Sequence, residues 1–212
     1  MKKILLLMVG LFLCTHLFSQ SAQYVGAMKA HFLKLKEAKT PESFQSIANG
    51  FERIAAAEKS EWLPKYYAAF CYVMQAMTIA DKDKVDAIID QSEKLLEEAS
   101  ILSVNDEIMC VQSLCKSARI GVDPMTRGMK YGMESAKILG QAKALNPNNP
   151  RVYYLEGQSK YYTPEAYGGG KKAAKELFEK AVATYAVFKP ANELMPTWGD
   201  EQTMQMLEEC SK

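Results

Sequence analysis

Histidine is scarce in this chain of 212 residues, and its scarcity argues against most metal and nucleophile chemistry. Beyond the first twenty residues, His31 is the single histidine. Zinc and iron centres usually draw on several histidines or cysteines, and a serine or cysteine nucleophile needs a base beside it. Cys110 and Cys115 lack the spacing of a CxxC pair. We therefore expect no metal site, no cofactor and no catalytic residues, and we expect that the protein is not an enzyme.

A long basic run is also missing. The chain has 26 lysines and arginines against 25 acidic residues, a net charge of +1. Nucleic-acid affinity depends on a concentrated positive surface, and recognition of anionic membrane surfaces depends on a polybasic cluster. We therefore expect neither nucleic acid nor an anionic membrane surface as a partner.

No apolar run is long enough for an ordinary membrane span, which takes about 20 residues. The N-terminal segment MKKILLLMVGLFLCTHLFSQ has Lys2 and Lys3, then an apolar run over 4–13, then small and polar residues. This order is typical of a secretory signal. We predict a cleaved signal peptide at 1–20 and one helical domain at 21–212. The mature chain would then be periplasmic or extracellular, with no integral span and a net charge near neutral.

The N-terminal segment allows two other interpretations. An uncleaved membrane anchor would need a longer apolar run. A lipoprotein signal would use Cys14 as the lipid-attachment residue, but that cysteine is usually preceded by a small residue and Leu13 stands there. Lipidation is therefore disfavoured, and the exact cleavage site stays open.

Four cysteines belong to the predicted mature chain, and export would expose them to an oxidising compartment. Cys110 and Cys115 lie about 140° apart on a helix, so they cannot pair within one helix. Cys71 with one of these two is the pairing that stays open, and Cys210 has no evident partner. We prefer four free thiols in helix interfaces, because a chain of this length does not need disulfides to be stable.

Strand-like alternation of apolar and polar residues is absent, and nearly everything after the signal has helical periodicity. Thr40, Asn105 and Asp123 stand at predicted helix starts as N-cap residues, with proline or acidic residues after them. The sequence therefore predicts an all-α protein. The expected helices are 22–38, 41–58, 62–80, 84–102, 105–121, 124–145, 150–162, 171–188 and 200–210.

A short pattern recurs along these helices, in which a large apolar residue is followed three positions later by another apolar residue. The pairs are Phe51/Ile54, Leu96/Ala99, Leu139/Ala142 and Phe178/Ala181. The pattern returns at about 40 residues, a period typical of stacked helical hairpins.

The C-terminal half, ESAKILGQAKALNPNNPRVYYLEGQSKYY followed by KKAAKELFEKAVATY, resembles the tetratricopeptide repeat. The matching positions of the second helix are Ser135, Leu139, Ala142 and Pro147, then Ala174, Phe178 and Ala181, with Leu155 and Gly157 as a looser match in the first helix. The resemblance implies a right-handed α-solenoid of three to four degenerate hairpins with a C-terminal capping helix. It also implies a concave groove that holds a protein or peptide partner.

The stretch TPEAYGGGKK interrupts the last hairpin. A phosphate-binding loop would need glycine where Glu165 stands and a hydroxyl residue where Lys172 stands. We expect a structural turn instead, in which Pro164 starts the turn, the glycines adopt positive φ and Tyr167 folds back on the hairpin. This turn and the following KELFEKA also resemble repeat proteins associated with TRAP-type transporters.

Tyrosines are concentrated in the last hairpin, and two interpretations of them stay open. Most aromatic residues of a helical stack fill its core. Alternatively, the concave side presents a ligand-binding set in which tyrosines give contact area and an arginine holds a carboxylate: Arg151, Tyr154, Tyr161, Tyr162 and Tyr167. Trp198 is expected to anchor the segment before the last helix.

Three classes of function compete. The favoured hypothesis is an exported non-catalytic scaffold that engages a protein or peptide partner in the bacterial envelope. The alternative is a periplasmic small-ligand-binding component associated with a transporter. A divergent enzyme is the least favoured. The sequence leaves open whether the groove is empty or filled by Phe32, Leu33 and Leu35 of the N-terminal helix.

Overall fold

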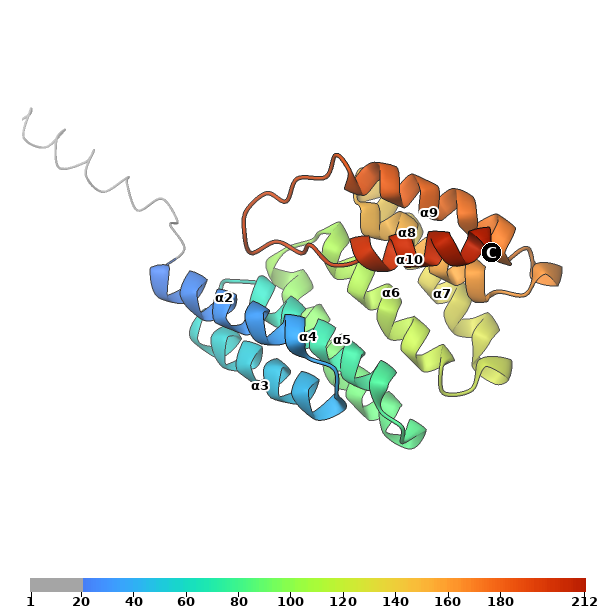
Figure 1. Cartoon of the computed structure of the whole chain (residues 1–212). Coiled ribbons are helices and arrows are strands. Elements are labelled where there is room, and N and C mark those ends of the chain that lie inside the picture. Colours follow the sequence, from blue (N-terminus) through green and yellow to red (C-terminus); the bar gives the residue numbers. More distant parts are fainter. Residues whose placement is uncertain (1–20) are drawn as a thin grey trace, which may run out of the picture.

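The computed structural model describes residues 21–212, and every regular element in that range is helical (Figure 1). The α-helices are α2 (Ala22–Glu37), α3 (Pro41–Ala57), α4 (Leu63–Thr78), α5 (Val85–Leu102), α6 (Asp106–Ile120), α7 (Pro124–Leu145), α8 (Pro150–Tyr162), α9 (Lys171–Tyr185) and α10 (Asp200–Ser211). Two short 3-10 helices are η1 (Lys82–Lys84) and η2 (Glu165–Tyr167). The predicted all-α class is confirmed. The predicted signal peptide and Cys14 lie outside the described residues.

Helix starts follow the side-chain caps predicted from the sequence. The Thr40 hydroxyl accepts a hydrogen bond from the Ser43 amide at 3.2 Å, and the Asn105 side chain accepts one from the Ile108 amide at 3.0 Å. The Asp123 carboxylate accepts from two amides at the start of α7. These caps satisfy backbone donors that no earlier turn of the helix reaches, so they fix where each helix begins.

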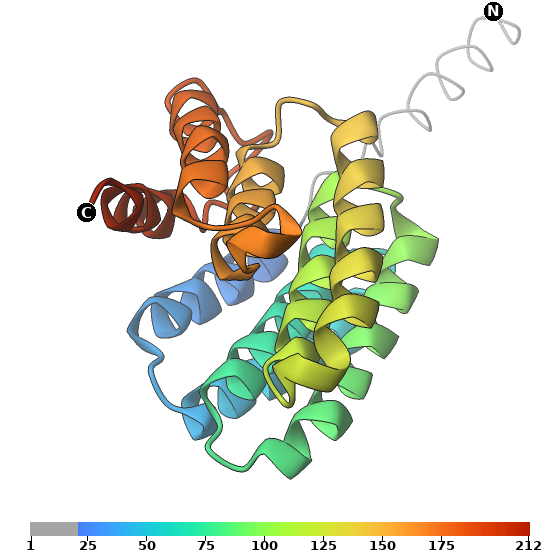
Figure 2. The same ribbon diagram turned by 90° about the vertical axis from the view of Figure 1, so that its right-hand side faces the viewer.

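Helices that follow one another in the chain pack mainly as hairpins. The main pairs are α3 with α4, α4 with α5, α6 with α7, and α8 with α9, while α10 packs on α9. Contacts between α4 and α6, and between α6 and α8, join the hairpins side by side. Figure 2 shows the same arrangement from the end that carries α7 and η2. Of its two neighbours in the chain, α7 packs mainly on α6, and its contact with α8 is smaller.

The recurrent sequence pattern marks the hairpin interfaces. Phe51, Leu96, Leu139 and Phe178, the large residues of the four pairs, are all buried. Gly157 shows why a small residue stands opposite one of them, because a Cβ there would lie 2.6 Å from the Phe178 ring. The close approach of α8 to α9 therefore depends on this glycine.

All four described cysteines are free, which confirms the preferred interpretation. Cys71, Cys110 and Cys115 are buried, and Cys210 is partly buried. Burial raises the pKa of the Cys115 thiol to about 12, and its sulfur lies 3.4 Å from the Ser92 hydroxyl. These thiols act as small core side chains.

Residues 186–199, here called the C-terminal strap, connect α9 to α10 and pass over α4 and α8 (Figure 1). The Tyr67 hydroxyl donates to the Leu194 carbonyl at 2.9 Å, and the Trp198 indole donates to the Tyr66 hydroxyl at 2.8 Å. Trp198 also stacks on Phe70 with ring centroids 5.2 Å apart. Trp198 thus anchors the segment before the last helix.

The N-terminal helix covers the neighbouring part of α4. The Phe32 ring lies 4.6 Å from the Tyr67 ring, whereas the Leu33 side chain is largely exposed. Lys29 of α2 and Glu193 of the C-terminal strap form an ion pair at 2.8 Å. The inner side of α4 is therefore covered by the C-terminal strap together with Phe32.

Candidate functional site

The five residues predicted to bind a ligand do not share one surface. Arg151 and Tyr154 are buried, and Tyr161 is partly buried. Tyr162 and Tyr167 are 73% and 79% exposed. Tyr161 and Tyr162 meet edge to face at 5.1 Å. The fold therefore does not bring all five side chains together in a single concave site.

Arg151 is paired with Glu107 inside the protein. Its guanidinium donates two hydrogen bonds to the Glu107 carboxylate, one at 2.7 Å, and a third at 3.4 Å to the Trp198 carbonyl. Asn149 donates to the same carboxylate at 3.0 Å. Burial raises the pKa of Glu107, although Arg151 opposes this shift. The Arg151 fork therefore joins α6, α8 and the C-terminal strap, and holds an internal carboxylate.

Aromatic rings surround this ion pair. The Arg151 guanidinium lies 4.8 Å from the Phe188 ring centroid and 5.6 Å from that of Trp198. The Tyr185 hydroxyl donates to the Trp198 carbonyl at 2.9 Å, and the Tyr154 ring packs edge-on to Trp198. The C-terminal strap covers this cluster, so its aromatic faces are part of the core.

The glycine-rich turn is structural, but one part of its prediction was wrong. Gly168 and Gly170 have φ values of 76° and 91°, as expected for a chain reversal. At Gly169 a Cβ would lie 2.1 Å from the Thr163 carbonyl oxygen. Tyr167 does not fold back on the hairpin, because the η2 turn that Gly168 closes onto Glu165 directs its ring into solvent.

A shallow cavity of about 320 Å³ lies between α3 and the end of α4. It is lined by polar and apolar groups together: Pro41, Glu42, Gln45, Ser46, Asn49, Gln75 and Ile79. The Gln75 side-chain oxygen is buried and accepts no hydrogen bond from the described residues. The volume is at the lower end of ligand pockets. This cavity suits a small molecule and is too small for a large planar ligand.

The main exposed apolar surface on a single helix belongs to α7. Met125, Met129 and Met133 are 94%, 78% and 65% exposed. With about 100° of rotation per residue, they share a strip about 100° wide with Gly132, Ala136 and Gly140. A Cβ added at either glycine would meet no atom within 4 Å. These six residues are here called the methionine face.

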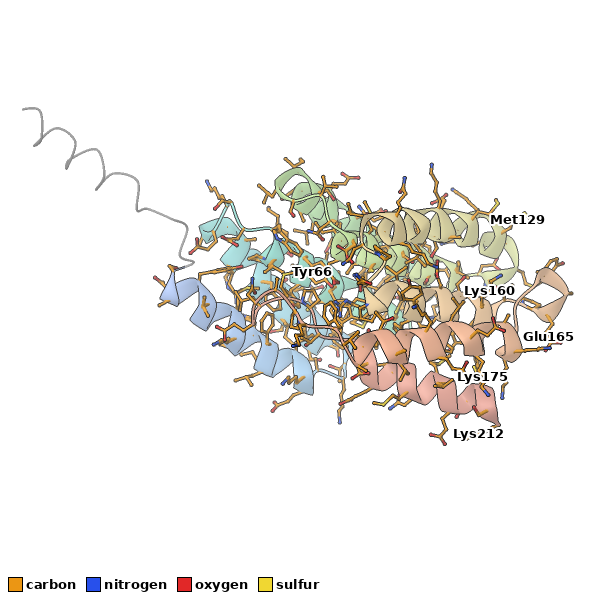
Figure 3. All side chains as sticks on the ribbon, turned by 90° about the horizontal axis from the view of Figure 1, so that it is seen from above. Tyr66, Met129, Lys160, Glu165, Lys175 and Lys212 are labelled. Atoms are coloured by element: carbon orange, nitrogen blue, oxygen red, sulfur yellow. The ribbon has the colours of Figure 1, made fainter. Side chains whose placement is uncertain are left out.

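Neighbouring contacts show which way the methionine face is turned. Lys143 lies on the same line of α7 as Met125, and its ammonium binds Glu156 of α8 at 2.8 Å. The other flank of α7 is held by α5 and α6, through Arg127 bound to Asp86 at 2.9 Å. The methionine face therefore borders α8. Figure 3 shows Met129 at the edge of the molecule, at the same end as Lys160 of α8.

Positive charge borders the methionine face. Lys130 and Lys137 stand beside Met133 on the solvent side of α7. Within residues 21–212 neither lysine has a carboxylate partner, and Lys130 lies 5.0 Å from the Tyr131 ring centroid. Lys160 lies across from this helix and donates to the Gly168 carbonyl at 3.1 Å. An apolar strip with unpaired cations at its border suits a flat apolar ligand that carries carboxylates.

His31 is used for packing. Its Nδ1 lies 2.9 Å from the Ala27 carbonyl oxygen, and its ring contacts Phe51. A Cβ at Gly50 would lie 2.1 Å from its Nε2, so the second ring nitrogen is directed at the α3 backbone. Within the described range, no cluster of three or more histidine, cysteine or acidic side chains is arranged to hold a metal ion. Within residues 21–212, none of the helices has the length and apolar content that a membrane span needs.

Two of these features were missed in the sequence. Glu107 is 44 positions before Arg151, and nothing local links them. The methionine face does have a local signal, since Met125, Met129 and Met133 recur every four residues with glycines between them. A helix stripe of this kind predicts an apolar face, and only the structure shows that no other helix within residues 21–212 covers it.

The fold defines a class of protein, an all-helical protein built of hairpins with an exposed apolar face on one helix. A solved structure, the HusA haemophore from Porphyromonas gingivalis, matches the chain with 36% sequence identity and a TM-score of 0.82. The match covers 91% of this chain and 95% of that one, so the chain belongs to the family of the HusA haemophore. No protein-family model and no curated protein matches the chain.

This finding corrects the favoured functional hypothesis. The hypothesis of a scaffold that engages a protein or peptide partner is wrong, because the matching structure is that of a haemophore, a haem-capturing protein. The alternative, a small-ligand-binding component, is the one that the comparison favours. Of the tetratricopeptide resemblance, the structure supports only helical hairpins in an all-α fold, and membership of that repeat family is not confirmed.

Proposed function

We propose that this protein is an exported, non-catalytic binding protein that captures haem or a closely related tetrapyrrole. The observation that carries the proposal is the similarity to the HusA haemophore over nearly the full length of both chains. A likeness of that extent and identity makes a shared ligand class the simplest expectation.

Haem is flat and largely apolar, with two carboxylates on one edge and an iron that accepts soft or nitrogen ligands. The methionine face offers exposed apolar area, and Lys130 and Lys137 offer charges for carboxylates. Methionine is one of the residues that ligate haem iron in proteins. The residues present therefore fit such a ligand, although His31 is turned into the helix packing.

Export is part of the proposal. The N-terminal segment has the composition of a secretory signal, and a protein that captures haem acts where the ligand is encountered, in the periplasm or outside the cell. The hairpins are proposed to form a right-handed α-solenoid, supported by the contacts of α4 with α6 and of α6 with α8. Association with a transporter stays a prediction.

The proposal is tested by titrating purified Ser21–Lys212 with haem and following the visible absorption band. We expect a saturable change that fits one class of site, and haem that is recovered chemically intact afterwards. A spectrum that changes in proportion to added haem without saturation would overturn the proposed ligand. Progressive loss of the haem band would instead indicate an enzyme.

A further inference from the structure

We propose that the methionine face of α7 is the surface on which the tetrapyrrole lies, with its carboxylates directed to Lys130 and Lys137. This inference rests on the proposed function and adds the position of the ligand. It concerns a surface that α6 and α8 leave open.

The first argument is the nature of the surface. Three methionines in successive turns are mostly exposed, an arrangement unlike scattered single apolar residues. Methionine is flexible and polarizable and adapts to the shape of a ligand. Gly132 and Gly140 leave open space where other residues would project, so a planar ligand approaches the helix backbone closely.

The second argument is charge. Lys130 and Lys137 lie along one border of the methionine face and have no acidic partner within the described residues. The acidic residue between them, Glu134, is turned to Lys116 of α6 at 3.4 Å. The border therefore presents net positive charge at the edge of an apolar strip, which complements a flat apolar molecule with carboxylates on one edge.

Other surfaces of the described chain fit this ligand less well. The Arg151 cluster has aromatic rings and a cation, but the C-terminal strap covers it and the guanidinium is already paired with the Glu107 carboxylate. The cavity beside Gln75 is small, with a volume of about 320 Å³. Ile101 at the end of α5 and Val104 in the turn after it are exposed, but they do not recur in successive turns of a helix as the three methionines do.

The test uses a triple variant of Ser21–Lys212, Met125→Gln, Met129→Gln and Met133→Gln, in the haem titration. Glutamine keeps side-chain length and helix propensity but removes the apolar contact. The matched control is Met204→Gln on α10, where the methionine is also exposed. Circular dichroism and the urea midpoint verify that each variant folds.

We expect the Kd of the triple variant for haem to rise on the order of tenfold or more. Burying one apolar side chain contributes about as much free energy as a tenfold change in Kd. The control should bind as the wild type does. Lys130→Gln with Lys137→Gln should weaken binding several-fold and reduce its salt dependence, whereas Lys36→Gln with Lys172→Gln should not.

Each outcome separates the inference from the proposed function. If the wild type binds haem and the triple variant binds it equally well, the methionine face is not the site, while the proposed function stands. If the wild type binds no haem, both fail. If the wild type is a dimer in size-exclusion chromatography and the triple variant is a monomer, the methionine face is an interface between copies of the chain, and the inference is overturned.

Discussion

At the scale of single residues, the most consequential contact is the buried pair of Arg151 and Glu107. Both side chains are almost fully removed from solvent, and the carboxylate accepts a further hydrogen bond from Asn149. Two charges inside a protein are costly to desolvate, so such a pair contributes mainly by fixing geometry. Here it fixes α6, α8 and the C-terminal strap relative to one another.

We predict that Arg151→Met destabilises the protein by about 3–5 kcal/mol, because it leaves Glu107 buried without its partner. Urea unfolding followed by circular dichroism measures the change. The double variant Glu107→Leu with Arg151→Met should recover most of the loss, since no unpaired charge is left. A single variant that unfolds at the wild-type midpoint would show that the pair does not constrain the fold.

Gly157 illustrates how far sequence reasoning reaches at this scale. A small residue was expected there from the repeat pattern, and the structure shows the Phe178 ring in the space that a Cβ would fill. The tyrosine and arginine set was less predictable. Side chains one residue apart on α8, such as Tyr161 and Tyr162, differ by about 100° in direction. The burial of Arg151 and Tyr154 depends on contacts with the C-terminal strap.

At the scale of elements, α7 is held against α5 and α6 by ion pairs on one flank. Arg127 of α7 binds Asp86 of α5, and Glu134 of α7 binds Lys116 of α6. Arg119 of α6 binds the same Asp86 together with Asp90 and Glu93 of α5. On the opposite flank of α7, which carries the methionine face, α8 is the neighbouring helix and its contact with α7 is smaller. The same element therefore has an attached side and an open side.

This network predicts a pH dependence. Burial tends to raise the pKa of Asp86 and Glu93, but hydrogen bonds from Arg127, Lys116 and Arg119 outweigh it, so both values are lower in the folded protein. Groups with a lowered folded pKa stabilise the fold above their unfolded pKa, and that stabilisation is lost as the pH falls. We expect the urea midpoint to decrease as the pH falls below about 4.5.

The control for this prediction is Arg119→Met, which removes the shared cation of the network. Its urea midpoint should be lower than that of the wild type at pH 6, and the difference should shrink toward pH 3. A constant difference across this range would show that the carboxylates do not act through Arg119.

At the scale of the whole molecule, the helices and their order were predictable, because apolar periodicity and capping residues are local signals. Thr40, Asn105 and Asp123 start helices as expected. The route of the C-terminal strap was not predictable, since it depends on contacts such as Tyr67 with Leu194, which are 127 positions apart. Function was not predictable either, because a helical stack alone does not determine what it binds.

The measurement that tests the central claim most directly is equilibrium dialysis of Ser21–Lys212 against dilute haem, with the bound haem counted per folded chain. The account predicts that haem accumulates with the protein until a fixed ratio of one per chain is reached, and that this ratio does not rise with further haem. Equal haem concentrations on both sides of the membrane, with folded protein on one side, would contradict it.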